Sequence, residues 1–294
     1  MMKTRFLAGI LATTMLLTGC SLFDKEEPLP MYIQVEAPRV QLDGNTNLSS
    51  RLGIKDLWID QGADFLGVIE VGKTIPVYPG ESEKYLLTGG IFNSGLSGFR
   101  TKYPFWKSVP QTIPFSPLDT VKISPLITYF PRDSALIYPF EETFETGGNA
   151  LVDLNVNSPT VKLERSTSSV FQGSQAGKAI FTSIDSIMEV VSDQTFSLPG
   201  SGQNSVWLEL TFKSDIPFAA GIYYEEAGQP NFGPIGGDIL FKSNDWTTVY
   251  VPLTDPVRAL AGANLRYRVW FQANGRGESG TMYIDYIRLI HFAQ

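Results

Sequence analysis

Four segments in the second half of the chain alternate apolar and polar residues along their length. They cover residues 205–213 (SVWLELTFK), 246–253, 265–272 (LRYRVWFQ) and 281–290. A period of two is typical of strands that bury one face, as in an antiparallel sandwich. Because no segment shows a clear helical period and turn residues separate the runs, the pattern predicts an all-β protein.

The first half contains shorter strand patterns separated by glycine and proline. Residues 54–91 contain a predicted strand, a glycine-containing turn, a second strand and a "TIPVYPGE" segment that leads into a third. We predict two β-sandwich modules: a small, immunoglobulin- or prealbumin-like first module at 31–126 and a larger second module at 133–294. The 54–91 segment resembles PEGA and prealbumin-like sandwiches, which implies a spacer or docking surface rather than chemistry.

An aromatic segment at residues 97–119 stands out within the first module. It places five rings among prolines: Phe99, Tyr103, Phe105, Trp106 and Phe115. One interpretation is an irregular loop that covers a core or a sheet edge. The other is an exposed aromatic contact surface for a partner protein.

The second module resembles the jelly-roll sandwiches of carbohydrate-binding modules. Three motifs occur in the order found in that family: Phe144-Glu145-Thr146-Gly147, then Trp246 to Leu253, and finally Tyr283-Ile284-Asp285. The resemblance implies a jelly-roll β-sandwich over about 155 residues. It does not imply one function, because the same fold serves sugar binding, adhesion and plain structure.

The N-terminus has the pattern of a lipoprotein leader. Lys3 and Arg5 precede an uncharged apolar run that is too short to span a bilayer but suits a signal peptide at 1–19. Leu17-Thr18-Gly19-Cys20 resembles the lipobox of bacterial lipoproteins, which implies acylation of Cys20 and a tether at 20–30. Ser21, where an aspartate would resemble an inner-membrane retention signal, favours the outer membrane. Asp24-Lys25-Glu26-Glu27 resembles the export signal of Bacteroidetes surface lipoproteins; the alternative is a solvated tether.

The net charge and the cysteine content exclude some kinds of partner and binding site. Removal of Lys3 and Arg5 with the leader takes the net charge from −7 to −9. An acidic chain lacks the basic surface that nucleic acids need, so we expect no nucleic-acid partner. Cys20 is the single cysteine, so its acylation leaves no thiol for disulfides or zinc. We expect contact with the membrane through the lipid alone.

A ligand or partner surface is predicted on the polar faces of two strands. Trp207 and Glu209 lie on one strand, and Arg268, Trp270 and Gln272 lie on the other. If both strands share a sheet, rings and polar groups form one patch suited to sugars. Alternatively, the tryptophans pack beneath loops or against the first module. The loop at 223–238, with Tyr223 and Tyr224, is a second binding candidate.

Metal and catalytic sites are less well supported by the sequence. In many jelly rolls of the resembled family, acids on the first and last strands hold a structural Ca²⁺; Glu142 or Glu145, with Asp285, occupy those places here. The alternative is solvated carboxylates. His291 is the single histidine, and we expect it to be a packing or surface residue. No serine-nucleophile or zinc motif appears, so we predict no enzyme.

Together these patterns predict a lipid-anchored outer-membrane protein, exposed at the cell surface. We expect a non-catalytic structural or accessory subunit of an outer-membrane complex, with a barrel protein as partner. The alternative is a glycan-binding surface lipoprotein that uses the jelly-roll module.

Overall fold

The computed structural model describes residues 27–41, 53–80, 83–147, 150–154, 161–200, 204–226, 233–260 and 265–293. Within these ranges strands are by far the dominant regular structure, and the single helix is the short α2 (Thr254–Ala259). No helix in this part of the chain is long and apolar enough to cross a membrane. The all-β prediction is therefore confirmed, whereas Cys20 and the predicted signal peptide lie outside the described residues.

Ten strands belong to the first module and its border. They are β1 (Met31–Val35), β2 (Arg39–Gln41), β3 (Asp56–Gln61), β4 (Asp64–Glu70), β5 (Thr74–Val77), β6 (Lys84–Phe92), β7 (Arg100–Lys102), β8 (Val109–Thr112), β9 (Thr120–Ile123) and β10 (Leu126–Thr128). The largest sheet runs β4-β3-β6-β7, with β8 also paired to β6. A second sheet runs β5-β1-β9, and β10 pairs with β2.

Eleven strands form the second module. They are β11 (Leu136–Glu142), β12 (Leu151–Asp153), β13 (Glu164–Ser166), β14 (Ala176–Phe181), β15 (Ile187–Ser192), β16 (Val206–Ser214), β17 (Phe218–Glu226), β18 (Gly233–Leu240), β19 (Ser243–Pro252), β20 (Leu265–Asn274) and β21 (Gly280–Phe292). One sheet runs β13-β14-β21-β16-β19, with β11 also on β21, and the other runs β12-β15-β20-β17-β18.

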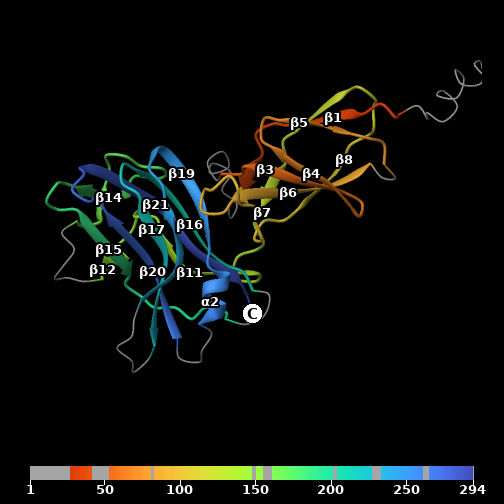
Figure 1. Ribbon diagram of the computed structural model, residues 1–294. Helices are drawn as coiled ribbons and strands as arrows, with labels where there is room; N and C mark the ends of the chain where they lie inside the picture. The colour runs from red at the N-terminus through yellow and green to blue at the C-terminus, as the bar shows by residue number, and fades with distance from the viewer. Residues whose placement is uncertain are drawn as a thin grey trace, which may run out of the picture.

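The two sheets of the second module enclose one apolar core. Val206, Leu208 and Leu210 of β16 lie in this core with Val269 and Phe271 of β20. Figure 1 shows these strands (green to blue) as a body beside the one formed by β1 to β8 (red to yellow). The β-sandwich prediction is confirmed; the residue boundaries of the two modules stay a prediction.

The opposite face of β16 is buried as well, because the first module covers it. Trp207 belongs to a second apolar cluster, which also contains Tyr103, Phe105 and Trp106. The Tyr103 ring centroid lies 5.5 Å from that of Trp207 and 4.6 Å from that of Tyr250 on β19. The aromatic segment at 97–119 is therefore largely a packing element, although the Phe99 side chain remains 65% exposed.

A β-bulge in β21 orients the polar groups on this covered face. Glu209 pairs with Arg288 and Thr211 with Asp285, so β21 has one residue more than β16 between these pairs. Tyr286 lies in the extra stretch and has a φ of 54°. A bulge shifts the alternation of a strand by one residue. As a result Tyr286 and Arg288 both face the first module, while Ile287 stays in the sandwich core.

Candidate functional site

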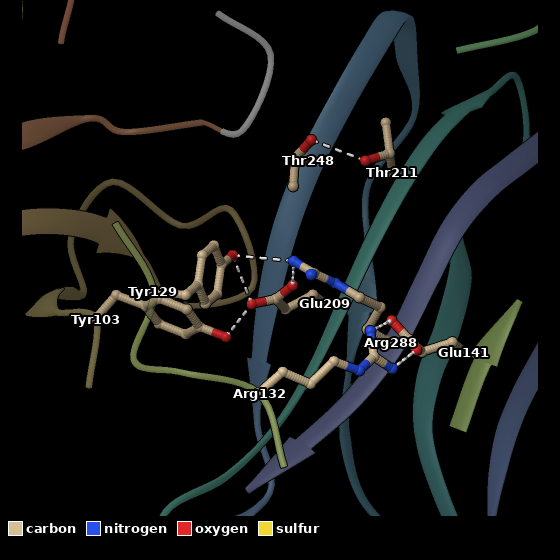
Figure 2. Close-up of polar contacts among 8 residues, drawn as sticks. All are labelled: Tyr103, Tyr129, Arg132, Glu141, Glu209, Thr211, Thr248 and Arg288. Carbon is tan, nitrogen blue, oxygen red and sulfur yellow. Dashed lines mark hydrogen bonds and ion pairs between the residues drawn. The ribbon is translucent and has the colours of Figure 1, made fainter. Parts of the chain in front are cut away.

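Four side chains from both modules form a buried polar network at the junction. The Tyr103 hydroxyl donates to Glu209, and the Tyr129 hydroxyl donates to Glu209 Oε1 over 3.0 Å. Arg288 forms an ion pair with Glu209 and donates to the Tyr129 oxygen over 3.0 Å. Figure 2 shows the two tyrosines reaching toward the carboxylate and the guanidinium.

The electrostatics of this network follow from its burial. Glu209 and Arg288 are each 1% exposed. Burial, followed by the Glu209 charge, raises the pKa of both tyrosine hydroxyls well above their usual range. Burial disfavours the Arg288 charge, but Glu209 and the surrounding tyrosines hold its pKa above the usual range.

Aromatic rings complete the surroundings of the guanidinium. Its carbon lies 4.8 Å from the Tyr286 ring centroid, 5.1 Å from that of Tyr129 and 5.5 Å from that of Tyr138. Cation–π contacts of this kind gain strength when water is excluded. Arg288 and Glu209 are sealed from solvent, so we interpret the network as a structural link between the modules rather than a ligand site.

The predicted single patch on two neighbouring strands is wrong. β16 and β20 lie in different sheets of the sandwich, so Trp207 and Trp270 are on opposite sides of it. Trp207 is 7% exposed and Glu209 is 1% exposed because the first module packs on them. The alternative interpretation, in which this tryptophan packs against the first module, is the one that the structure supports.

The residues on β20 do face outward together, on the outer face of the second sheet. Arg268 pairs with Tyr223 of β17, and Gln272 pairs with Glu189 of β15. Because paired residues share one face of a sheet, these side chains form a contiguous surface around Trp270. We call the set Glu189, Tyr223, Glu225, Arg268, Trp270 and Gln272 the β20 face.

Hydrogen bonds hold most of the β20 face in place. The Trp270 Nε1–H donates to Glu189 Oε1 over 3.0 Å, and Gln272 Nε2 lies 3.5 Å from the same oxygen. Arg268 donates to Glu225 over 2.6 Å and to the Ser192 carbonyl over 2.7 Å. Trp270 is only 6% exposed, so it supports this surface and does not offer its ring as a stacking platform.

The two tyrosines of the predicted recognition loop point in opposite directions. Tyr223 lies on the β20 face and is half-buried. Burial, then the charges of Glu189 and Glu225, raises the pKa of its hydroxyl. Tyr224 instead packs against the sandwich core, which corrects its prediction as a surface residue. The part of this loop at 227–232 lies outside the described residues.

A pocket of about 380 Å³ continues the β20 face toward the end of the sheet. Gln272 of the β20 face lines the pocket beside Ala219, and Ile239, Lys242 and Arg276 also line it. The Ile239 side chain is 63% exposed. Polar and apolar side chains thus lie next to each other at a pocket that is large enough for a small ligand.

The carboxylates predicted to hold Ca²⁺, Glu142 or Glu145 together with Asp285, each accept hydrogen bonds from backbone N–H groups. Glu142 accepts the backbone N–H groups of Phe144 and Ala150, and Glu145 accepts those of Ser174 and Gln175. Asp285 accepts three further backbone N–H groups. A cation would have to displace these donors, and no cluster of three or more metal-ligating side chains occurs among the described residues. The calcium prediction, which paired Glu142 or Glu145 with Asp285, gains no support from this arrangement and stays a prediction.

His291 pairs with Val206 of β16, whose side chain lies in the sandwich core, so the histidine is on the core-facing side of β21. It is 8% exposed, and its Nδ1 lies 2.7 Å from the Phe292 carbonyl oxygen. Burial lowers the pKa of its imidazole. The expectation of a packing residue is confirmed.

Comparison with solved structures finds carbohydrate-binding β-sandwiches among the chains with some similarity to this one. No protein-family model and no curated protein matches the sequence. A structure of β-sandwich superfamily carbohydrate-binding modules of promiscuous specificity shares 13% identity, with a TM-score of 0.38 and coverage of 90% of this chain and 99% of that chain.

Two modules from Clostridium thermocellum are also similar. The family 11 module, solved with a β-1,3-1,4-mixed-linked tetrasaccharide, shares 13% identity at a TM-score of 0.37 and covers 53% of this chain and 95% of its own. The C-terminal family 22 module of Xyn10B shares 14% identity at a TM-score of 0.33 and covers 52% of this chain and 92% of its own. These TM-scores lie below 0.5, so no conclusion about the fold or the ligand of this chain is drawn from the likenesses.

Proposed function

We propose that the protein is a lipid-anchored, non-catalytic glycan-binding protein and that the β20 face is its binding surface. The observation that carries the proposal is the grouping of Tyr223, Arg268 and Gln272 on one outward sheet face beside a pocket of about 380 Å³. Sugars need hydrogen-bonding groups for their hydroxyls and apolar surface for their C–H faces. Tyr223 and the exposed Ile239 supply the apolar part.

The anchor is part of the same proposal. The lipobox-like Leu17-Thr18-Gly19-Cys20 supports acylation of Cys20, and Ser21 supports delivery to the outer membrane. A surface anchor would hold the β20 face toward extracellular glycans. Metabolic labelling with a clickable fatty acid tests this step, with Cys20→Ala expected to abolish the label.

Glycan binding is tested with the full chain in detergent on a glycan array. Each bound glycan is then measured by titration calorimetry against Tyr223→Ala and Gln272→Ala. Loss of one well-placed contact is expected to weaken binding about tenfold. Lys122→Ala, at an exposed position of the first module, is the matched control and should bind as wild type. Absence of any bound glycan, or equal binding by all variants, would count against the proposal.

A second candidate function is an accessory subunit of an outer-membrane complex. Large exposed apolar side chains on the first module favour it, with Phe65 54% exposed and Phe99 65% exposed. Such side chains often mark partner surfaces. Affinity purification from gently solubilised membranes should then recover a barrel protein, and Phe99→Ala should reduce its recovery. A tagged chain that purifies alone would argue against this function.

A further inference from the structure

A second pocket lies where the two modules meet, on the side of the sandwich that carries β16 and β19. Its lining comes from both modules: Gly53, Ile54 and Lys55 on one side, and Val170, Phe171, Trp246, Thr247 and Thr248 on the other. Its volume is about 470 Å³, within the range of small-molecule sites, which favour such junctions. We call it the junction pocket.

Aromatic rings form one wall of the junction pocket. The ring centroids of Phe171 and Trp246 lie 5.8 Å apart, and the Tyr283 ring follows at 6.3 Å from Trp246. Phe171 is buried, whereas Trp246 is only half-buried, so part of its ring remains accessible. A supported and partly exposed indole is a surface on which a sugar ring can lie.

Hydrogen bonds within the protein hold the residues of this wall in place without a ligand. The buried Asp285 carboxylate accepts the backbone N–H groups of Phe171 and Gln172, each over 3.2 Å. The Thr248 hydroxyl lies 2.8 Å from that of Thr211, a pair that Figure 2 shows on adjacent strands. A preformed site spends little binding energy on ordering its own groups.

The lining of the junction pocket is positively charged, although the chain as a whole carries a negative net charge. Lys55 is the only charged residue among the described residues that line the pocket, and no carboxylate lines it. Within the described part of the chain, no acidic side chain forms an ion pair with the Lys55 ammonium; its backbone groups bond to Gly90 and Val71. The pocket is thus complementary to an anion that also carries an apolar face.

We propose that the junction pocket binds a uronate residue of an acidic glycan. The C–H face of the sugar would lie on Trp246, and its carboxylate would meet the Lys55 ammonium. The inference rests on the proposed glycan-binding function for its ligand class but uses residues remote from the β20 face. Because both modules line the pocket, the site exists only when they are docked.

Titration calorimetry of the full chain with oligogalacturonate tests the inference. Wild type should bind the acid form and not its methyl ester, and added salt should weaken binding. Lys55→Gln should weaken binding about tenfold or more, since a charge-assisted contact is lost. Lys55→Arg should retain it, and Trp246→Ala should abolish it. Lys122→Gln removes a charge elsewhere and should change nothing.

The outcomes separate this inference from the proposed function. Loss of oligogalacturonate binding in Lys55→Gln with normal binding in Lys122→Gln supports the junction pocket. Loss in Tyr223→Ala alone, or equal affinity for acid and ester, overturns the inference and leaves glycan binding at the β20 face standing. If neutral glycans bind and glycans that contain uronates do not, only the junction pocket is overturned; binding of no glycan overturns both proposals. Unchanged thermal unfolding of Lys55→Gln controls for misfolding.

Discussion

At the scale of single residues, the buried ion pair between Glu209 and Arg288 is the centre of the polar network that links the two modules. Both side chains are sealed between the modules, and the carboxylate also accepts the hydroxyls of Tyr103 and Tyr129. Removing one charge from such a pair leaves the other buried without compensation. The network therefore acts as a specific connector whose members depend on one another.

A double-mutant cycle should reveal this dependence. We expect Glu209→Gln and Arg288→Met each to lower the free energy of unfolding by roughly 3–5 kcal/mol. The double variant should lose clearly less than the sum, because no lone charge remains. Urea unfolding measures all three. The exposed pair Lys122–Glu36 is the control, and Lys122→Met should cost about 1 kcal/mol or less. Simple additivity at Glu209 and Arg288 would contradict the network.

Asp285 predicts a dependence of stability on pH. Burial raises the pKa of its carboxyl from 3.8 to about 7, although three backbone N–H groups oppose the shift. Between about pH 4 and pH 7 the folded chain therefore binds more protons at this site than the unfolded chain. The free energy of unfolding should fall as the pH rises through this window and level off above it.

Urea unfolding at about pH 5 and about pH 8 measures this effect. From Asp285 alone we expect a loss of roughly 2–3 kcal/mol between the two conditions. Asp285→Asn should remove that part of the slope. Asp56, whose pKa burial raises to about 6, has the same sign and remains in both proteins. An identical slope in wild type and variant would show that Asp285 does not titrate in this range.

At the scale of elements, alternation identified strands well but could not assign them to sheets. The strands predicted at 205–213 and 265–272 coincide with β16 and β20 to within one or two residues at their ends. Their polar faces look alike in the sequence, yet one lies under the first module and the other on the outer surface. Burial of Trp207 depends on Tyr103, which is about a hundred residues away, and no local pattern contains that contact. No sequence pattern predicts the bulge at Tyr286 either.

Gly90 in β6 is an element-scale test of close packing. A Cβ atom there would overlap the Asp56 carboxylate and lie 2.6 Å from Trp58 Nε1. We expect Gly90→Ala to lower the free energy of unfolding by about 1–3 kcal/mol through overpacking. Gly98 has no atom within 4 Å of the corresponding position, so Gly98→Ala should stay within about 0.5 kcal/mol of wild type. Thermal unfolding compares the two, and equal effects would refute the packing argument.

At the scale of the whole molecule, the two sandwich bodies share a core rather than only a linker. One apolar cluster combines Met31, Ile33 and Tyr103 of the first module with Trp207 and Tyr250 of the second. A backbone hydrogen bond of 2.8 Å also joins Ser94 to the Tyr250 carbonyl. Sequence patterns predicted two modules and left packing of Trp207 against the first module as an alternative, but they could not select it, since each strand that takes part is amphipathic by itself.

This shared core predicts that the modules unfold together. Calorimetry should record one transition whose van't Hoff and calorimetric enthalpies agree. Tyr103→Ala, at the junction, and Phe218→Ala, inside the sandwich core, should each shift that same transition downward by roughly 3–5 kcal/mol in unfolding free energy. If the modules were independent, two transitions would appear and each substitution would move a different one. A junction that unfolds as one unit would also preserve the pocket between the modules for as long as the protein is folded.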